Sequence, residues 1–293
     1  MPASALALVI LAGLIHAVWN IAAKKAGGDA RFAAFSSLLC ILIWAPVGLW
    51  LGWRILPNWG AMEWSFVVVS GVLHVLYYVV LLRGYRSADL TVVYPLARGT
   101  GPLLSSTAAI LFLGERPTLA GIAGIAAVVA GVFLIAGGPG LFRAAYEPAK
   151  RAMVRRGAAY GALTGVFIAA YTVVDGYAVK VAAMSPILLD YFSIFVRIGV
   201  LAPVVLRDRP VLAALWRQQW KYAFVVALVS PVSYVLVLYA MQSAPLSHVA
   251  PAREVSMLFA ALIGGQLLGE GDRALRLAGA ACIACGVMAL ALG

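Results

Sequence analysis

Arg98 and Glu254 are charged residues within stretches of sequence that otherwise resemble lipid-soluble helices. Arg98 lies in VVYPLARGTGPLL, residues 92–104, with Tyr94 one helical turn before it on the same face. Glu254 lies in a second apolar stretch, directly after Arg253. A guanidinium stays charged in proteins, and it costs on the order of a few kcal/mol or more at a bilayer centre. Ionisable groups in such places typically face a bundle interior, where they bind a ligand, an ion or one another.

Further polar side chains recur at helical spacing in other apolar stretches. His16 and Asn20 are four residues apart and therefore share one helix face, which Trp19 borders. His74 and Tyr78 form a similar stripe in a later stretch. Stripes of this kind are typical of two arrangements, a hydrogen-bonded seam between helices and the wall of a polar cavity. We expect these residues to line a cavity.

Asp175 and Arg197 are two more charged residues deep within apolar stretches. Tyr171 lies one turn before Asp175 on the same face, whereas Asp190 lies near the end of its stretch, where an interfacial position is expected. A structural ion pair between Asp175 and Arg197 is one interpretation, and a part in ligand binding is the other. The sequence leaves both open.

The composition is that of an integral membrane protein. Of the 293 residues, 64% are hydrophobic and 11% are charged, whereas a soluble domain carries about a quarter charged residues. The net charge of +11 requires no nucleic acid partner, because anionic lipid headgroups attract basic loops. The odd number of cysteines, three, provides no disulfide framework.

Apolar stretches long enough to span a bilayer recur along the whole chain. A spanning helix needs about 20 predominantly apolar residues, and the joints between the stretches carry turn and charge signals such as KKAGGDAR and GEGD. The sequence therefore predicts an all-α integral membrane protein with ten transmembrane helices. The predicted helices are Ala3–Ala23, Phe32–Gly52, Trp64–Arg83, Thr91–Leu113, Pro117–Ala136, Ala158–Val179, Pro186–Leu206, Lys221–Ala240, Ser247–Leu268 and Ala274–Leu292.

An internal repeat divides the chain into two halves. The dipeptide at Gly114 and Glu115 recurs 155 positions later at Gly269 and Glu270. A shift of 156 positions brings Pro95 onto Pro251, and the same shift brings Arg98 onto Glu254. A near-constant shift across two predicted helices indicates a duplicated unit. The repeat therefore places Arg98 and Glu254, which have opposite charges, at matching depths in the membrane.

The two halves are expected to have opposite orientations in the membrane. Each half holds five predicted helices, and an odd number inverts the second copy relative to the first. Inverted repeats of this kind are typical of transporters that bind their substrate near the bilayer midplane. We predict a first repeat over residues 1–138, a linker over 139–156 and a second repeat over 157–293.

Three features of the sequence resemble EamA-type members of the drug/metabolite transporter superfamily. They are YPLARGTGPLL in the fourth predicted helix, the GE dipeptides after the fourth and ninth, and HAVWNIAAK in the first. The resemblance covers nearly the whole chain. It implies that the fourth and ninth helices line a central cavity, and that the protein moves a metabolite by alternating access without ATP. The lack of a GxxxxGK[ST] phosphate loop agrees with this, and no cofactor or metal is expected.

The intramembrane arginines Arg98, Arg197 and Arg253 favour a small anionic or zwitterionic substrate such as an amino acid or a phosphonate. A guanidinium fork matches carboxylate or phosphonate oxygens. Glu254 or Asp175 is then expected to bind an ammonium group or to carry the proton that drives transport. Two alternatives remain, an exporter of cationic drugs or quaternary amines and a flippase for a lipid-linked headgroup. We expect no enzyme, because neither HExxH nor GxSxG occurs.

The distribution of basic residues predicts the orientation. Only Arg54, Arg116 and Lys180 lie in the joints after even-numbered helices, whereas the joints after odd-numbered helices hold most of the other Lys and Arg residues. The positive-inside rule therefore places the basic joints in the cytoplasm of a bacterial cell and both termini on the outer side of the inner membrane. The sequence leaves the oligomeric state, a monomer or a homodimer, open.

Overall fold

Every regular element in the described residues, 1–26, 30–88, 90–135, 148–206, 209–259 and 273–293 of a computed structural model, is helical. This confirms the predicted all-α fold. The helices are α1 (Ala3–Lys25), α2 (Ala30–Ile55), the 3-10 turn η1 (Leu56–Asn58), α3 (Ala61–Ser87), α4 (Leu90–Phe112), α5 (Leu119–Ile135), α7 (Pro148–Lys180), α8 (Pro186–Leu206), α9 (Arg209–Ser243), α10 (Leu246–Ala252) and α12 (Arg273–Leu292).

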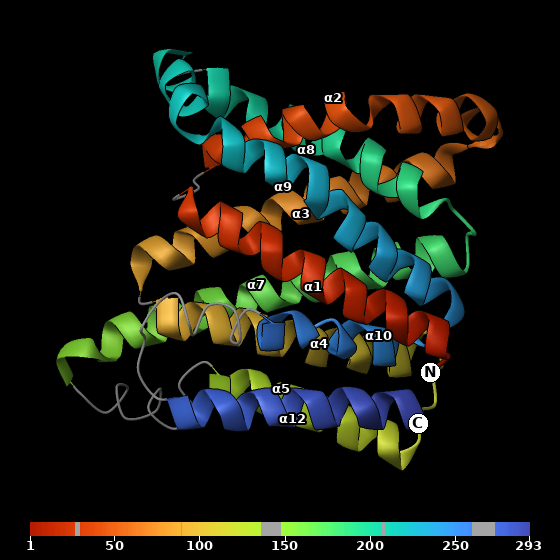
Figure 1. The fold of residues 1–293 in the computed structure, drawn as a ribbon, viewed down its shortest axis with the longest axis vertical. Coiled ribbons are helices and arrows are strands. Elements are labelled where there is room, and N and C mark those ends of the chain that lie inside the picture. Colours follow the sequence, from red (N-terminus) through yellow and green to blue (C-terminus); the bar gives the residue numbers. More distant parts are fainter. Residues whose placement is uncertain (27–29, 89, 136–147, 207–208, 260–272) are drawn as a thin grey trace.

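The long helices run side by side across the molecule, so that their ends gather at two opposite ends of the bundle (Figure 1). Helices α2 and α8 lie at one edge and α5 and α12 at the other, with α1, α3, α4, α7, α9 and α10 between them. Both termini lie at the same end, and the amino group of Met1 donates to the carbonyl oxygen of Ala291 over 3.0 Å. An even number of membrane crossings places both termini on the same side in this way.

The outer surface fits a bilayer. By length and composition, six described segments qualify as membrane spans, and α5 and α12 are shorter but also apolar. Tryptophans lie near the ends of these spans, at Trp50 and Trp53 in α2 and at Trp220 in α9, as in the aromatic belts of membrane proteins. Trp53 is 85% exposed, the Arg54 guanidinium lies 5.2 Å from the ring centroid of Trp50, and the Lys221 ammonium lies 5.7 Å from that of Trp220. The chain is a multi-pass membrane protein.

Two helices begin earlier than their apolar stretches. Helix α7 begins at Pro148, inside the segment predicted as a linker, and α9 begins at Arg209. The added turns are rich in Ala, Arg, Lys and Met or Leu, which are strong helix formers, and proline is favoured in a first turn. Of the predicted linker, residues 139–147 lie outside the described residues, as do Glu270 and residues 260–268 of the ninth predicted helix.

The ninth predicted helix is interrupted. Helix α10 ends at Ala252, residues 253 and 254 form a turn, and helical structure resumes over residues 255–259. Pro251 lacks an amide hydrogen and its ring crowds the preceding turn, which favours a break at this point. The Glu254 amide donates to the Pro251 carbonyl at 3.0 Å, and the Met257 amide to the Glu254 carbonyl at 2.8 Å. These three-residue spacings mark the tightened turn.

The contact between α5 and α12 reveals the inverted repeat directly. A Cβ atom on Gly131 would lie 2.6 Å from the carbonyl oxygen of Gly279, and one on Gly279 would lie 2.7 Å from that of Gly131. Gly124 and Gly286 approach each other in the same way, at 2.8 and 2.9 Å. The repeat shift of 155 positions relates Gly124 to Gly279 and Gly131 to Gly286. The contact of Gly131 with Gly279 and the contact of Gly124 with Gly286 are therefore related to each other by the twofold axis of the repeat. The two halves of the chain are therefore inverted copies.

A line of glycines brings α7 against α4, the helix that carries Arg98. Gly157, Gly161 and Gly165 are spaced by four residues on α7. A Cβ atom on Gly161 would lie 2.8 Å from the Val93 carbonyl oxygen, and one on Gly165 would lie 3.0 Å from the Gly101 amide nitrogen. Small residues at this spacing let membrane helices approach at backbone distance. The middle of α7 is thereby held close to the middle of α4.

The first GE dipeptide joins the two repeats at the end of the bundle where the termini lie. Gly114 has a positive φ of 69°, which glycine adopts without strain. Glu115 then accepts hydrogen bonds from the amides of Leu246, at 2.7 Å, and Ser247, at 2.8 Å, in the first turn of α10. The Lys180 ammonium lies 3.4 Å from the same carboxylate.

The acid form of Glu115 is correspondingly disfavoured. Burial opposes the charged carboxylate, but the hydrogen bonds from Ser247 and Leu246, together with Lys180, outweigh it and lower the pKa of Glu115. A carboxyl whose pKa is lower in the folded state stabilises the fold above its unfolded pKa of about 4.3. That stabilisation is lost as the pH falls through the folded-state pKa.

The change Glu115→Gln should therefore lower the free energy of unfolding at pH 7 by about 1–3 kcal/mol, because hydrogen bonds to a charged group are lost. The measurement is the unfolding temperature of the detergent-purified protein as a function of pH. The gap between wild type and variant should narrow as the pH falls below about 4. Glu63→Gln is the control, since Glu63 bonds the Gly60 amide of its own helix start. A gap independent of pH, or an equal loss in the control, contradicts the interpretation.

Candidate functional site

Arg98 and Glu254 meet at the centre of the bundle. The Arg98 Nη2 atom lies 2.9 Å from Glu254 Oε2, and it also donates to the Ser256 hydroxyl over 2.9 Å. The Glu254 side chain is 1% exposed and that of Arg98 is 13% exposed. The pair joins α4 of the first repeat to the interruption after α10 in the second. Two residues that the repeat places at equivalent positions therefore form a buried ion pair.

Arg253, beside Glu254, points to a different partner. Its Nη2 atom donates to the Tyr171 hydroxyl of α7 over 3.0 Å, and its guanidinium carbon lies 5.8 Å from the centroid of the Tyr171 ring. A cation at this distance from an aromatic ring is attracted to it. The site thus contains two arginines and one glutamate, and each arginine has its own contacts.

An aromatic cluster of His74, Tyr77, Tyr171 and Tyr234 continues from Arg253. The His74 and Tyr171 rings stack with centroids 4.1 Å apart, and the Tyr234 ring lies edge-on to His74 at 5.4 Å. The Tyr77 ring lies 5.8 Å from that of Tyr171. His74 Nδ1 lies 2.8 Å from the Ser70 carbonyl oxygen, so the nitrogen carries a proton there. The cluster joins α3, α7 and α9.

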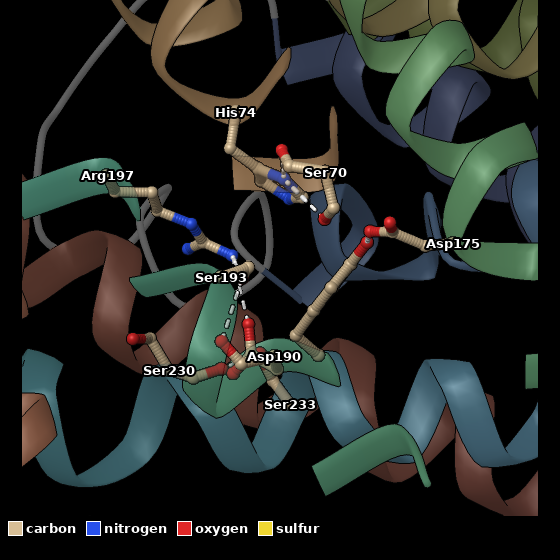
Figure 2. Close-up of polar contacts among 9 residues, drawn as sticks. Ser70, His74, Asp175, Asp190, Ser193, Arg197, Ser230 and Ser233 are labelled. Atoms are coloured by element: carbon tan, nitrogen blue, oxygen red, sulfur yellow. Dashed lines mark hydrogen bonds and ion pairs between the residues drawn. The ribbon is translucent and has the colours of Figure 1, made fainter. Parts of the chain in front are cut away.

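Asp175 lies on the far side of this cluster and is fully buried, at 0% exposure. The Tyr234 hydroxyl donates to Asp175 Oδ2, whereas the buried Oδ1 atom has no hydrogen-bond partner within the described structure. Ser70 and His74 lie next to it on α3 (Figure 2). Asp175 is therefore a buried acid that is held by a neutral hydroxyl.

The interpretation that Asp175 forms an ion pair with Arg197 is wrong. Arg197 Nη2 lies 3.0 Å from Asp190 Oδ1 and donates to the Ser193 hydroxyl over 2.9 Å, and Figure 2 shows Arg197 directed at these two residues of its own helix. Asp190, expected at the interface, is instead buried at 4% exposure. Asp190 and Arg197 are seven residues apart, which is two helical turns, so they reach each other without a second helix.

The predicted residues of α1 lie against α9. The rings of His16 and Trp19 are 4.6 Å apart, and Trp19 Nε1 donates to the Ser233 hydroxyl over 3.3 Å. Asn20 is half-buried. The contact of Trp19 with α9 is a hydrogen-bonded seam between helices, and whether the stripe also lines a substrate cavity stays a prediction.

The two remaining predicted tyrosines, Tyr78 and Tyr94, are also half-buried. The ring of Tyr78 lies 6.5 Å from that of Tyr77, which places it beside the aromatic cluster. Tyr94 packs against the main hydrophobic core. Among the described residues, no hydrogen bond joins Tyr94 to Arg98 or Glu254.

Besides Tyr77, three members of the site lie outside the set of residues predicted from the sequence, namely Tyr171, Tyr234 and Ser256. Two of them carried a signal, because Tyr171 lies one turn before Asp175 and Tyr234 is the repeat mate of Tyr78, 156 positions later. Ser256 carried none, since its role depends on the break in the helix. Within the described ranges, no group of three or more His, Cys, Asp or Glu residues is arranged to hold a metal ion.

Comparisons with known proteins agree with this architecture. A solved structure, described as a crystal structure of a protein, matches all of this chain and 98% of its own chain, with a TM-score of 0.73 and 17% sequence identity, and that likeness shows the fold alone. No curated protein matches the chain. A family model, the EamA-like transporter family, matches residues 3–137 and 155–292, which are the two inverted halves. The chain therefore belongs to the EamA-like transporter family.

Proposed function

We propose that the protein is a secondary transporter that moves a small anionic or zwitterionic metabolite, such as an amino acid or a phosphonate, by alternating access around the central site. The observation that carries the proposal is a charge count. Arg98, Arg253 and Glu254 leave one positive charge uncompensated inside a bundle of apolar helices. An uncompensated charge is costly in such surroundings, and the anionic group of a solute would compensate it.

Membership of a transporter family supports transport over an enzymatic step. We propose net export across a bacterial inner membrane, in keeping with the resemblance to the drug/metabolite transporter superfamily. The central site in this proposal is formed by Arg98, Arg253 and Glu254, with Asp175, Arg197 and the predicted residues of α1, α3 and α4 around it.

A second candidate function rests on a different observation. Asp175 has no cationic partner in the described structure, and it lies next to the aromatic rings of His74, Tyr171 and Tyr234. Aromatic rings around a carboxylate are the arrangement that binds quaternary amines. The rival to our proposal is therefore an exporter of cationic compounds that bind at Asp175.

A thermal-shift screen distinguishes the two functions. The purified chain is heated with amino acids, phosphonates, sugar phosphates or quaternary amines, because a ligand that binds the folded state raises the apparent stability. At a concentration of about 100 times the dissociation constant the gain is about 2.7 kcal/mol. We expect shifts with members of the first three classes. Shifts with quaternary amines alone would replace the proposal with its rival.

We propose in addition that a proton drives transport and that Asp175 carries it. Glu254 is paired with Arg98 at 2.9 Å, whereas the described hydrogen-bond partner of Asp175 is the neutral Tyr234 hydroxyl. In proteoliposomes, Asp175→Asn should abolish uptake driven by a proton gradient and leave solute counterflow intact. Glu254→Gln is the comparison, because it should impair both activities. If Asp175→Asn retains full gradient-driven uptake, Asp175 is not the coupling group.

We also propose that both termini face the outer side of the membrane. Two observations support this orientation, the excess of Lys and Arg in the joints at the opposite end of the bundle and the contact of Met1 with Ala291 at one end. A reporter that is active only outside the cytoplasm, fused after Gly293, should be active. Activity of a cytoplasm-only reporter at the same position would reverse the orientation.

A further inference from the structure

We infer that Arg253, and not Arg98, binds the anionic group of the transported solute. The inference rests on the proposed function and assigns the recognition of the anion to one residue. It separates two arginines that are adjacent in the site but differ in their partners, their place in the repeat and their position relative to the helix break.

The charge of Arg98 is already compensated within the protein. Its Nη2 atom lies 2.9 Å from both Glu254 Oε2 and the Ser256 hydroxyl, whereas its buried Nε atom has no hydrogen-bond partner in the described structure. Glu254 lies in the interruption after α10 and Ser256 directly follows it, so Arg98 fixes the broken segment to α4. Removing Arg98 would leave Glu254 buried and unpaired, which is strongly destabilising. These contacts are those of a structural residue.

The charge of Arg253 has no such compensation. Its one described hydrogen-bond partner is the neutral hydroxyl of Tyr171, at 3.0 Å. The ion pairs of the described residues are Arg98 with Glu254, Arg197 with Asp190, and Lys180 with Glu115, and none includes Arg253. Its residue is only half-buried, and its remaining N–H groups are absent from the buried atoms that lack partners. They are therefore free to bind oxygens of a ligand.

The inverted repeat also distinguishes Arg253 from Arg98. A shift of 156 positions relates Arg98 to Glu254, so the charges of these mates cancel across the pseudo-twofold axis. The same shift relates Arg253 to Ala97, which is 1% exposed. Arg253 is therefore a charge of the second repeat with no counterpart at the equivalent position of the first. The Arg98–Glu254 pair between the two halves does not require it.

Arg253 also occupies the break in the helix. Its backbone lies in the turn between α10 and residues 255–259. The segment directly after the turn is clamped by α1, where a Cβ atom on Gly13 would lie 3.2 Å from the Ser256 amide nitrogen. Discontinuous membrane helices form the substrate sites of several transporter folds. Arg98 and Gly13 thus hold the segment in place, and the Arg253 guanidinium projects from it beside Tyr171.

The first test needs no ligand. Removal of a half-buried cation that has no acidic partner should not destabilise the protein, whereas removal of one half of a buried pair should. We expect Arg253→Ala to leave the unfolding temperature of the purified full chain unchanged or higher, and Arg98→Ala to lower it by several degrees. If Arg253→Ala lowers the unfolding temperature as much as Arg98→Ala, then Arg253 is structural and the inference is overturned.

The second test measures binding with defined probes, namely phosphate, methylphosphonate, 2-aminoethylphosphonate and glutamate. For the probe that stabilises the wild type most, Arg253→Ala should abolish the thermal shift. Arg253→Lys should weaken binding about ten-fold or more, because lysine lacks the planar fork. The discriminating comparison is the double variant Arg98→Ala with Glu254→Gln, which removes the pair together. If Arg253 alone binds the anionic group, this variant should still show a shift with the same probe, whereas Arg253→Ala should show none.

Each other outcome has a defined meaning. Loss of the shift in the double variant with retention in Arg253→Ala would assign the anion to Arg98 and overturn the inference while preserving the proposed function. If quaternary amines stabilise the wild type and none of the four anionic or zwitterionic probes does so, both the inference and the proposed function are overturned.

Discussion

The ion pair between Arg98 and Glu254 is the interaction on which the centre of this protein depends. Each residue alone would be an uncompensated charge in a bundle of apolar helices, and together they form a neutral pair that joins the two repeats at 2.9 Å. The pair also determines what can surround it. Because Arg98 binds Ser256 as well, the helix after α10 stays in place although its backbone is interrupted at residues 253 and 254.

Glycines of α7 let this helix approach α4, the helix that carries Arg98, closely. Gly161 and Gly165 place the backbone of α7 directly on that of α4, where a Cβ atom would meet the Val93 carbonyl oxygen at 2.8 Å. This approach brings Tyr171 of α7 within 3.0 Å of Arg253. Larger residues at these positions would separate the helices, and the hydrogen bonds of the site would be lost.

The sequence predicts the parts of this structure that repeat, and it fails where the two repeats differ. The shift of 156 positions aligns Arg98 with Glu254 from the sequence alone. Helix α8 begins and ends at the residues that its apolar stretch predicts, Pro186 and Leu206. Pro95 and Pro251 are repeat mates, yet α4 is continuous and only the second helix breaks. A proline permits both outcomes, and tertiary contacts decide between them. The sequence likewise places Asp190 and Arg197 two turns apart on one predicted helix, Pro186–Leu206, without revealing that they pair with each other.

The distribution of charge in the bundle connects substrate recognition with coupling. The Arg98–Glu254 and Arg197–Asp190 pairs are neutral, which leaves Arg253 as a surplus cation and Asp175 as a surplus acid, with Tyr171, His74 and Tyr234 between them. Under the proposed function, an anion that binds Arg253 compensates its positive charge, and the proton carried by Asp175 compensates the acid. A zwitterion would instead bring its own ammonium group to compete with that proton. Under the proposed function, whether a proton moves together with the solute or in exchange for it depends on whether the solute carries a positive charge, because in a low-dielectric site each uncompensated charge needs a partner.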